Sequence, residues 1–464
     1  MKIMMSLGWA GTMLLVGVLL RAKVPAFRRM LVPASVLAGL AGVVVMNLGI
    51  DVGADSGAYT QIVNELFTIS FISIGLTDAA PEEGGKSKAK GIAKGTFGMG
   101  LVWCILYALT PLIGFGIVKG LGSACDMNEI YGTMIPFAFT QGPGQAASFG
   151  VMYEGYGWKN AAMVGVSFAA MGFLASFLVG VPLAKLGINR RLARNVGQLE
   201  PKIARGYYRE QEQIDYMGKD TMYSGNLETL SFHFALIALC YILAVGLSKV
   251  FALIPGFFGG AMSGMMFMNG MLTSNVVRWL LHKLGLDFLK DSTLQRKLTG
   301  WTSDFLVVCS FMAVEFRVIG QWIVPMLVEA IVVTIITVAV CLYFGRRFGG
   351  ENDFERTLGL YGTSTGTVPS GIALVRIVDP ALHTTTAVEL GLMNYVMLFC
   401  TPVYFVLLGA AAGSISEGMM MGILAALVVV YLILLKIFRA WNKPTYSFSV
   451  ADDGKTDKRE VEQE

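Results

Sequence analysis

Two short polar segments interrupt long apolar stretches, and they hold the residues whose types and spacing could do chemistry. The first is Thr140–Gln145, which reads Thr-Gln-Gly-Pro-Gly-Gln, and the second is Gly362–Ser370, which is rich in Thr and Ser. Where a helix restarts inside a membrane, its free N–H groups and its dipole favour an anion, and exposed carbonyl and hydroxyl oxygens can bind sodium. We therefore predict that the two segments line a site for a small anion and sodium.

The predicted site residues come mainly from these segments. Candidates for substrate binding are Gln141, Gly142, Pro143, Gly144, Gln145, Ser148, Asn160, Thr363, Ser364, Thr365, Gly366, Thr367, Pro369 and Ser370. Candidates for sodium binding are Thr365, Thr367, Glu389 and Asn394. One alternative is that the Gly, Ser and Thr residues only let helices pack closely, and another is that Glu389 lies at the membrane interface. Arg376 could pair with a substrate carboxylate, although it lies beyond the second segment.

The composition is that of a membrane protein. Of the 464 residues, 55% are hydrophobic and 15% are charged, whereas soluble proteins carry about 25% charged residues. At about 20 apolar residues per crossing, the chain has room for about ten to twelve spans. Its six cysteines are scattered singly, so the spacing predicts no metal or redox pair. The first apolar stretch, Leu7–Leu20, precedes its positive charges, so we expect a retained first helix with its N-terminus outside.

The apolar segments predict helices at about 6–20, 33–50, 62–79, 97–118, 160–184, 230–250, 257–280, 303–320, 322–344, 385–411 and 418–438. Basic loops should lie in the cytoplasm. The basic loop after 184 lies in the cytoplasm only if the segment 131–153 enters the membrane and returns to the same side. Counting the crossings of the second half in the same way requires that 358–378 also returns to the side from which it entered. A Gly- or Pro-containing break in each segment favours such re-entrant hairpins.

These spans predict an all-α polytopic fold with two inverted-topology repeats of five transmembrane helices, each with a re-entrant hairpin. The first repeat covers 1–186 with its hairpin at 131–157, and a cytoplasmic linker covers 187–229. The second repeat covers 230–412 with its hairpin at 354–380. An extra helix at 413–440 and a disordered cytoplasmic tail at 441–464 follow. Since five is odd, the second half is inverted, as in many secondary transporters.

The sequence has no complete Walker motif of the form Gly-x-x-x-x-Gly-Lys-Thr/Ser and no His-Glu-x-x-His zinc motif. We therefore expect no enzyme activity, no cofactor and no nucleic-acid partner. The expected partners are a small anionic substrate, a sodium ion and the lipid bilayer, and ion coupling is the expected energy source.

Several motifs resemble those of the bacterial sodium/glutamate symporter family. They are Val32–Leu40, Ser70–Leu76, Gly142–Ala147 with Gly155–Ala161 after it, and Gly366–Ala373. The resemblance implies a homodimer. We expect it in the bacterial inner membrane, and the basic residues after the last helix predict a cytoplasmic C-terminus. The resemblance also implies sodium-coupled symport of glutamate or a related carboxylate by alternating access, with the hairpin tips lining the substrate path.

The first segment departs from that family's usual Gly-Gly-His-Gly-Thr-Gly. Here Pro143 stands at the His and Gln145 at the Thr, and Gln141 replaces a Gly. Since selectivity should reside at these positions, a different organic anion is an open alternative. So is an uncoupled or proton-coupled carrier, channel or exporter on the same scaffold.

Overall fold

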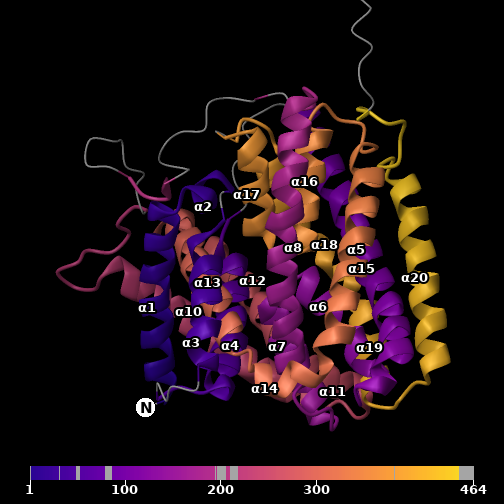
Figure 1. The fold of residues 1–464 in the computed structure, drawn as a ribbon. Coiled ribbons are helices and arrows are strands. Elements are labelled where there is room, and N and C mark those ends of the chain that lie inside the picture. The colour runs from indigo at the N-terminus through magenta and orange to yellow at the C-terminus, as the bar shows by residue number, and fades with distance from the viewer. Residues whose placement is uncertain are drawn as a thin grey trace, which may run out of the picture.

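The computed structural model describes residues 2–30, 32–48, 53–78, 86–193, 195, 205–208, 218–380 and 382–448. Within these ranges every regular element is a helix (Figure 1). The first half contains α1 (Lys2–Lys23), α2 (Pro25–Met30), α3 (Ala34–Asn47), α4 (Ser56–Leu76), α5 (Lys86–Leu121), the 3-10 turns η1 (Gly122–Ala124) and η2 (Glu129–Met134), α6 (Ile135–Phe139), α7 (Pro143–Gly155) and α8 (Ala161–Asn189).

The second half contains α10 (Thr229–Ala252), α11 (Phe257–Gly264), α12 (Met266–Lys283), η3 (Asp287–Leu289), α13 (Ser292–Met312), α14 (Phe316–Ile319), η4 (Gly320–Trp322), α15 (Ile323–Gly345), α16 (Asp353–Ser364), α17 (Val368–Val378), α18 (Thr386–Val396), η5 (Met397–Cys400) and α19 (Thr401–Ala411). The final helix, α20 (Glu417–Ile437), follows them. Each predicted apolar segment therefore coincides with one helix or with a consecutive pair.

Seven helical segments of the described chain are long and apolar enough to cross a membrane, which makes this a multi-pass membrane protein. They are Lys2–Lys23, Gly91–Ala124, Ala161–Asn189, Thr229–Ala252, Phe316–Gly345, Thr386–Ala411 and Glu417–Ile437. The predicted spans at α3, α4, α12 and α13 are helical too, but they are shorter or more polar than these seven.

The largest difference in boundaries concerns α13, which we predicted at about 303–320. The helix instead begins at Ser292 and ends at Met312. Asp291 caps its start by accepting a hydrogen bond from the backbone N–H of Leu294 at 2.7 Å. The first turns of α13 are polar. A prediction based on runs of apolar residues therefore places the start of this helix too late.

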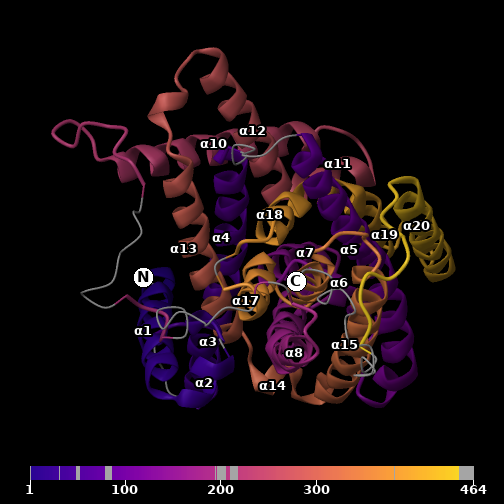
Figure 2. The same ribbon diagram turned by 90° about the horizontal axis from the view of Figure 1, so that it is seen from above.

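Two groups of helices lie side by side when the molecule is seen from above (Figure 2). The first group, called here the α4–α13 bundle, contains α1, α3, α4, α10, α12 and α13, and α4 packs on α13 at its centre. The second, called here the α5–α15 bundle, contains α5 to α8 and α15 to α20, and α5 packs on α15. The interface between these bundles holds the candidate site.

The α5–α15 bundle contains two antiparallel helical hairpins. In hairpin 1 (129–155), the ring of Phe137 stacks on that of Phe149 with centroids 4.0 Å apart, and the Thr133 and Tyr153 hydroxyls are 2.9 Å apart. In hairpin 2 (353–378), Gly362 packs against the backbone of Gly371. In each hairpin the two helices are therefore antiparallel and are joined by a short break, called here tip 1 (140–142) in hairpin 1 and tip 2 (365–367) in hairpin 2.

The packing of the two halves comes in matching pairs. Helix α1 packs on α3 as α10 packs on α12, and α3 packs on α13 as α12 packs on α4. Hairpin 1 packs on α8 as hairpin 2 packs on α18, and α5 contacts η2 as α15 contacts α16.

The beginning of the predicted disordered tail is ordered in this structure. The backbone N–H groups of Asn442 and Thr445 donate to the carbonyls of Arg347 and Arg346, both at 2.8 Å. The Tyr446 hydroxyl lies 2.7 Å from that of Thr357 in α16. Residues 441–448 therefore pack over the start of hairpin 2. The rest of the predicted tail, 449–464, and most of 194–217 in the predicted linker lie outside the described residues.

Candidate functional site

A cavity of about 520 Å³ lies between the two bundles. One wall comes from α4 and α13, and the opposite wall comes from α18 and the two hairpin tips. The predicted site residues that line it are Gln141, Thr363, Thr367, Pro369 and Asn394. The fold therefore brings both polar breaks, more than 200 residues apart in sequence, to one cavity.

The two tips touch each other at Gly142. This residue has φ 80° and ψ −170°, a conformation that is essentially restricted to glycine. A methyl group on Gly142 would lie 2.5 Å from Thr367 Cγ2 and 3.1 Å from the carbonyl oxygen of Gly366. Glycine is therefore required here both by the backbone and by the approach of tip 2.

Tip 1 is held by aromatic donors from α5. The indole N–H of Trp103 donates to the carbonyl of Thr140 at 3.0 Å, and the Tyr107 hydroxyl donates to Gln145 Oε1. The amide nitrogen of Gln145 is buried without a hydrogen-bond partner among the described residues. Ser148 donates to Asn64 Oδ1 in α4 at 2.6 Å. Gln145 and Ser148 thus stabilise the hairpin and its contact with α4, and neither lines the cavity.

Tip 2 leaves a buried oxygen available at the cavity wall. Thr365 is bound within its own hairpin, because its hydroxyl donates to the carbonyl of Tyr361 at 2.9 Å. Thr363 lines the cavity, and its buried hydroxyl has no hydrogen-bond partner in the described part of the chain. An unpaired buried hydroxyl is costly, so Thr363 is a plausible contact for a ligand.

Gly144, just after tip 1, and Gly366 in tip 2 allow other side chains of the protein to pack against the backbone. A methyl group on Gly144 would overlap the ring of Phe67 in α4, and one on Gly366 would lie 2.8 Å from Ser370 Oγ and 3.2 Å from the Phe173 ring. We predicted these residues from the need for a ligand to approach the backbone. The structure instead places side chains against them.

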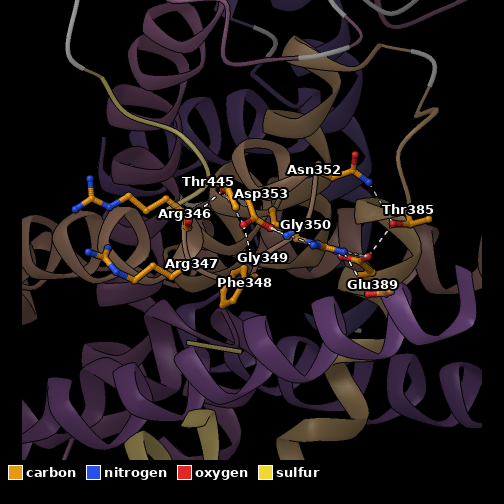
Figure 3. Close-up of polar contacts among 12 residues, drawn as sticks. Arg346, Arg347, Phe348, Gly349, Gly350, Asn352, Asp353, Thr385, Glu389 and Thr445 are labelled. Atoms are coloured by element: carbon orange, nitrogen blue, oxygen red, sulfur yellow. Dashed lines mark hydrogen bonds and ion pairs between the residues drawn. The ribbon is translucent and has the colours of Figure 1, made fainter. Parts of the chain in front are cut away.

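Two predicted residues lie away from the tips. Asn160 is exposed in the turn between α7 and α8, with φ 62°. Glu389 is buried and paired: its carboxylate accepts hydrogen bonds from Arg356 Nη2 at 2.6 Å, Arg356 Nε at 2.7 Å and the Thr385 hydroxyl at 2.7 Å (Figure 3). Since Asp353 also contacts Arg356 at 3.1 Å, Glu389 belongs to an ion-pair cluster at the start of hairpin 2.

The sequence reasoning missed two charged residues that line the cavity, Arg296 in α13 and Asp78 after α4. Asp78 is paired with Lys290. Burial opposes its charge, but hydrogen bonds from Lys290 and Ser292 outweigh that effect and hold the pKa of Asp78 below its usual value. No ion pair or hydrogen bond engages the Arg296 guanidinium among the described residues. Because α13 starts eleven residues before the predicted start, Arg296 was assigned to a loop.

Comparisons with known proteins give one family. The model of a family described as sodium/glutamate symporter matches residues 1–381. No curated protein matches the chain. Among solved structures, a sodium proton antiporter from Methanocaldococcus jannaschii is 14% identical over 89% of this chain and 100% of that chain, with a TM-score of 0.38. That structural likeness is too low to carry an argument.

Proposed function

The chain belongs to the sodium/glutamate symporter family, and from this premise we propose that it carries glutamate or a related small carboxylate across the membrane, driven by sodium. The cavity between the two bundles would hold the substrate. Alternating access would come from movement of the α5–α15 bundle, which contains both tips, against the α4–α13 bundle.

One observation carries the proposal: both hairpin tips and an unpaired arginine line the same cavity. The other charged residue in its lining, Asp78, is already neutralised by Lys290. Arg296 therefore remains to attract an anion, and a guanidinium binds a carboxylate through two parallel hydrogen bonds. The cavity of about 520 Å³ falls in the usual range for small-molecule sites.

Sodium would bind near tip 2. Thr363, Thr367 and Asn394 line the same cavity, and their side chains carry oxygen atoms of the kind that a hard cation prefers. The Thr365 carbonyl and hydroxyl lie at the same break. Glu389 is a weaker candidate, because its oxygens are engaged by Arg356 and Thr385.

The matching packing pairs of the two halves support two inverted repeats, with hairpins 1 and 2 entering from opposite sides of the membrane (Figure 1). With the basic loops inside, the N-terminus would lie outside and the C-terminus in the cytoplasm of a bacterial inner membrane. Cysteines introduced at Lys88 and Gln198 should then react only with cytoplasmic reagents, and one at Asp55 only with external ones. Labelling of position 198 from outside would exclude a re-entrant hairpin 1.

Family membership also supports a homodimer. The mass of the detergent-purified chain, measured by light scattering with the detergent subtracted, should be twice that of the polypeptide. If the chain has a monomeric mass in lipid nanodiscs, and the same preparation transports after reconstitution into vesicles, this part of the proposal is wrong.

The decisive experiment is uptake into proteoliposomes. Labelled glutamate, aspartate and unrelated dicarboxylates would be offered with a sodium gradient, with equal sodium on both sides, and with a proton gradient alone. We expect accumulation only with the sodium gradient. Sodium should raise the affinity for the substrate by the same factor as the substrate raises that for sodium. An uptake rate that does not depend on the sodium gradient would refute sodium symport. Accumulation driven by a proton gradient alone would favour a proton-coupled carrier.

A further inference from the structure

Glu329 is a buried acidic residue that plays no part in the proposed cavity. It lies in α15, within the apolar segment Phe316–Gly345, and its exposed fraction is 0%. Neither of its carboxyl oxygens has a hydrogen-bond partner among the described residues. The sequence contained the signal, a single acidic residue inside an apolar span, although our sequence analysis did not use it.

The carboxyl group of Glu329 faces a small gap between three elements. A methyl group on Gly114 in α5 would overlap both Glu329 Oε1 and the carbonyl oxygen of Gly132 in η2. The two oxygens therefore face the same space, which exists because Gly114 has no side chain. Next to this contact the rings of Tyr131 and Trp322 pack with centroids 5.1 Å apart.

Among the side chains that the structure describes, no positive charge contacts Glu329. The titratable and charged residues with described side chains on the elements packed around it are Lys94, Cys104, Tyr107, Lys119, Glu129, Tyr131, Lys185, Cys341, Tyr343, Asp353, Glu355, Arg356 and Tyr361. Lys119 pairs with Glu417 at 2.7 Å and lies 3.7 Å from Glu129. Arg356 pairs with Asp353 and Glu389. None of these cations, nor Lys94 or Lys185, donates a hydrogen bond to either carboxyl oxygen of Glu329.

An ionised carboxylate that is buried without a partner is strongly disfavoured, and such a group becomes neutral instead. A neutral carboxyl has one O–H donor, and the carbonyl of Gly132 is an acceptor facing the same gap. We propose that Glu329 is a proton-binding site, with the neutral acid donating its hydroxyl to the carbonyl of Gly132.

This site goes beyond the proposed function, because it adds a bound proton to a chain whose expected coupling ion is sodium. It sits at the contact between α5, α15 and the base of hairpin 1, away from the substrate cavity. Its occupancy depends neither on which carboxylate is carried nor on whether sodium drives uptake. A test that uses no substrate therefore separates this inference from the proposed function.

The test is infrared spectroscopy of the full chain in lipid at neutral pH, comparing H₂O with D₂O. A protonated carboxyl gives a C=O band distinct from that of carboxylates, and the band shifts in D₂O. We expect the wild type to show one such band that Glu329→Gln lacks. The matched control is Glu389→Gln, which removes a buried carboxylate that is paired with Arg356, and it should keep the band.

A second measurement avoids substitutions altogether. When the wild-type chain is labelled with ¹³C at the glutamate side-chain carboxyl, the band should move by the isotope shift, which assigns it to a glutamate. Failure of the label to move a protonated-carboxyl band would overturn the proposal. So would a band that Glu329→Gln retains, or one that appears only when sodium is removed, because the carboxylate would then be a sodium ligand.

Discussion

Replacing Gly142 by alanine tests the contact between the hairpin tips most directly. The added methyl group would meet Thr367 Cγ2 at 2.5 Å, and the residue would have to keep φ 80°. Backbone strain of this kind costs about 1–3 kcal/mol, and overpacking adds about 1–3 kcal/mol. Since 1.4 kcal/mol corresponds to tenfold, the population with touching tips should fall by roughly 30-fold or more.

The assay is the initial rate of sodium-driven glutamate uptake into proteoliposomes, normalised to reconstituted protein. We expect Gly142→Ala to lose most of this rate while its elution from gel filtration stays normal. The matched control is Gly246→Ala, because no atom lies within 4 Å of a methyl group on Gly246. That substitution in a helix should leave transport unchanged.

A double substitution separates the two contributions. Thr367→Ser removes Cγ2 but keeps the hydroxyl, so in the Gly142→Ala background it should relieve the clash and leave only the strain. We expect it to restore the rate about fivefold or more, as the overpacking range of about 1–3 kcal/mol predicts. Normal transport by Gly142→Ala would refute the reasoning, and the absence of any rescue would show that Thr367 is not the obstacle.

Three further predictions concern the cavity and its supports. Gly144→Leu and Gly366→Leu should each abolish uptake at normal expression, because the first overlaps Phe67 and the second crowds Phe173 and Ser370; normal transport by both variants would show that these packing contacts are not needed for uptake. Arg296→Gln should weaken carboxylate binding roughly 10- to 150-fold in a competition assay, since a hydrogen bond to a charged group contributes about 1.5–3 kcal/mol, and unchanged affinity would remove Arg296 from the site. Glu389→Gln should lower the free energy of unfolding in detergent by about 3 kcal/mol, as expected for a broken buried ion pair. If the sodium affinity falls while the free energy of unfolding is unchanged, Glu389 is a sodium ligand instead.

The positions of the helices and of both breaks could be predicted because their signals are local. Twenty apolar residues can satisfy their backbone in a membrane only by forming a helix. Gly142 and Pro143 interrupt such a helix wherever it packs, and so do the residues of tip 2. The predicted start of α13 was too late because its first turns are polar, although Asp291, which caps the helix, is itself a local signal.

The partner of each side chain was decided by the tertiary structure alone. Glu389 pairs with Arg356, and Arg296 lines the same cavity as two tips that lie far from it in sequence. Glu329 faces the carbonyl of Gly132 across the space left by Gly114. Burial and charge compensation depend on which helices pack together, and no local pattern encodes that choice. The sequence by itself therefore determined where helices form, where they break and where polar groups lie along the chain. Packing decided which of those groups are paired and which are left without a partner.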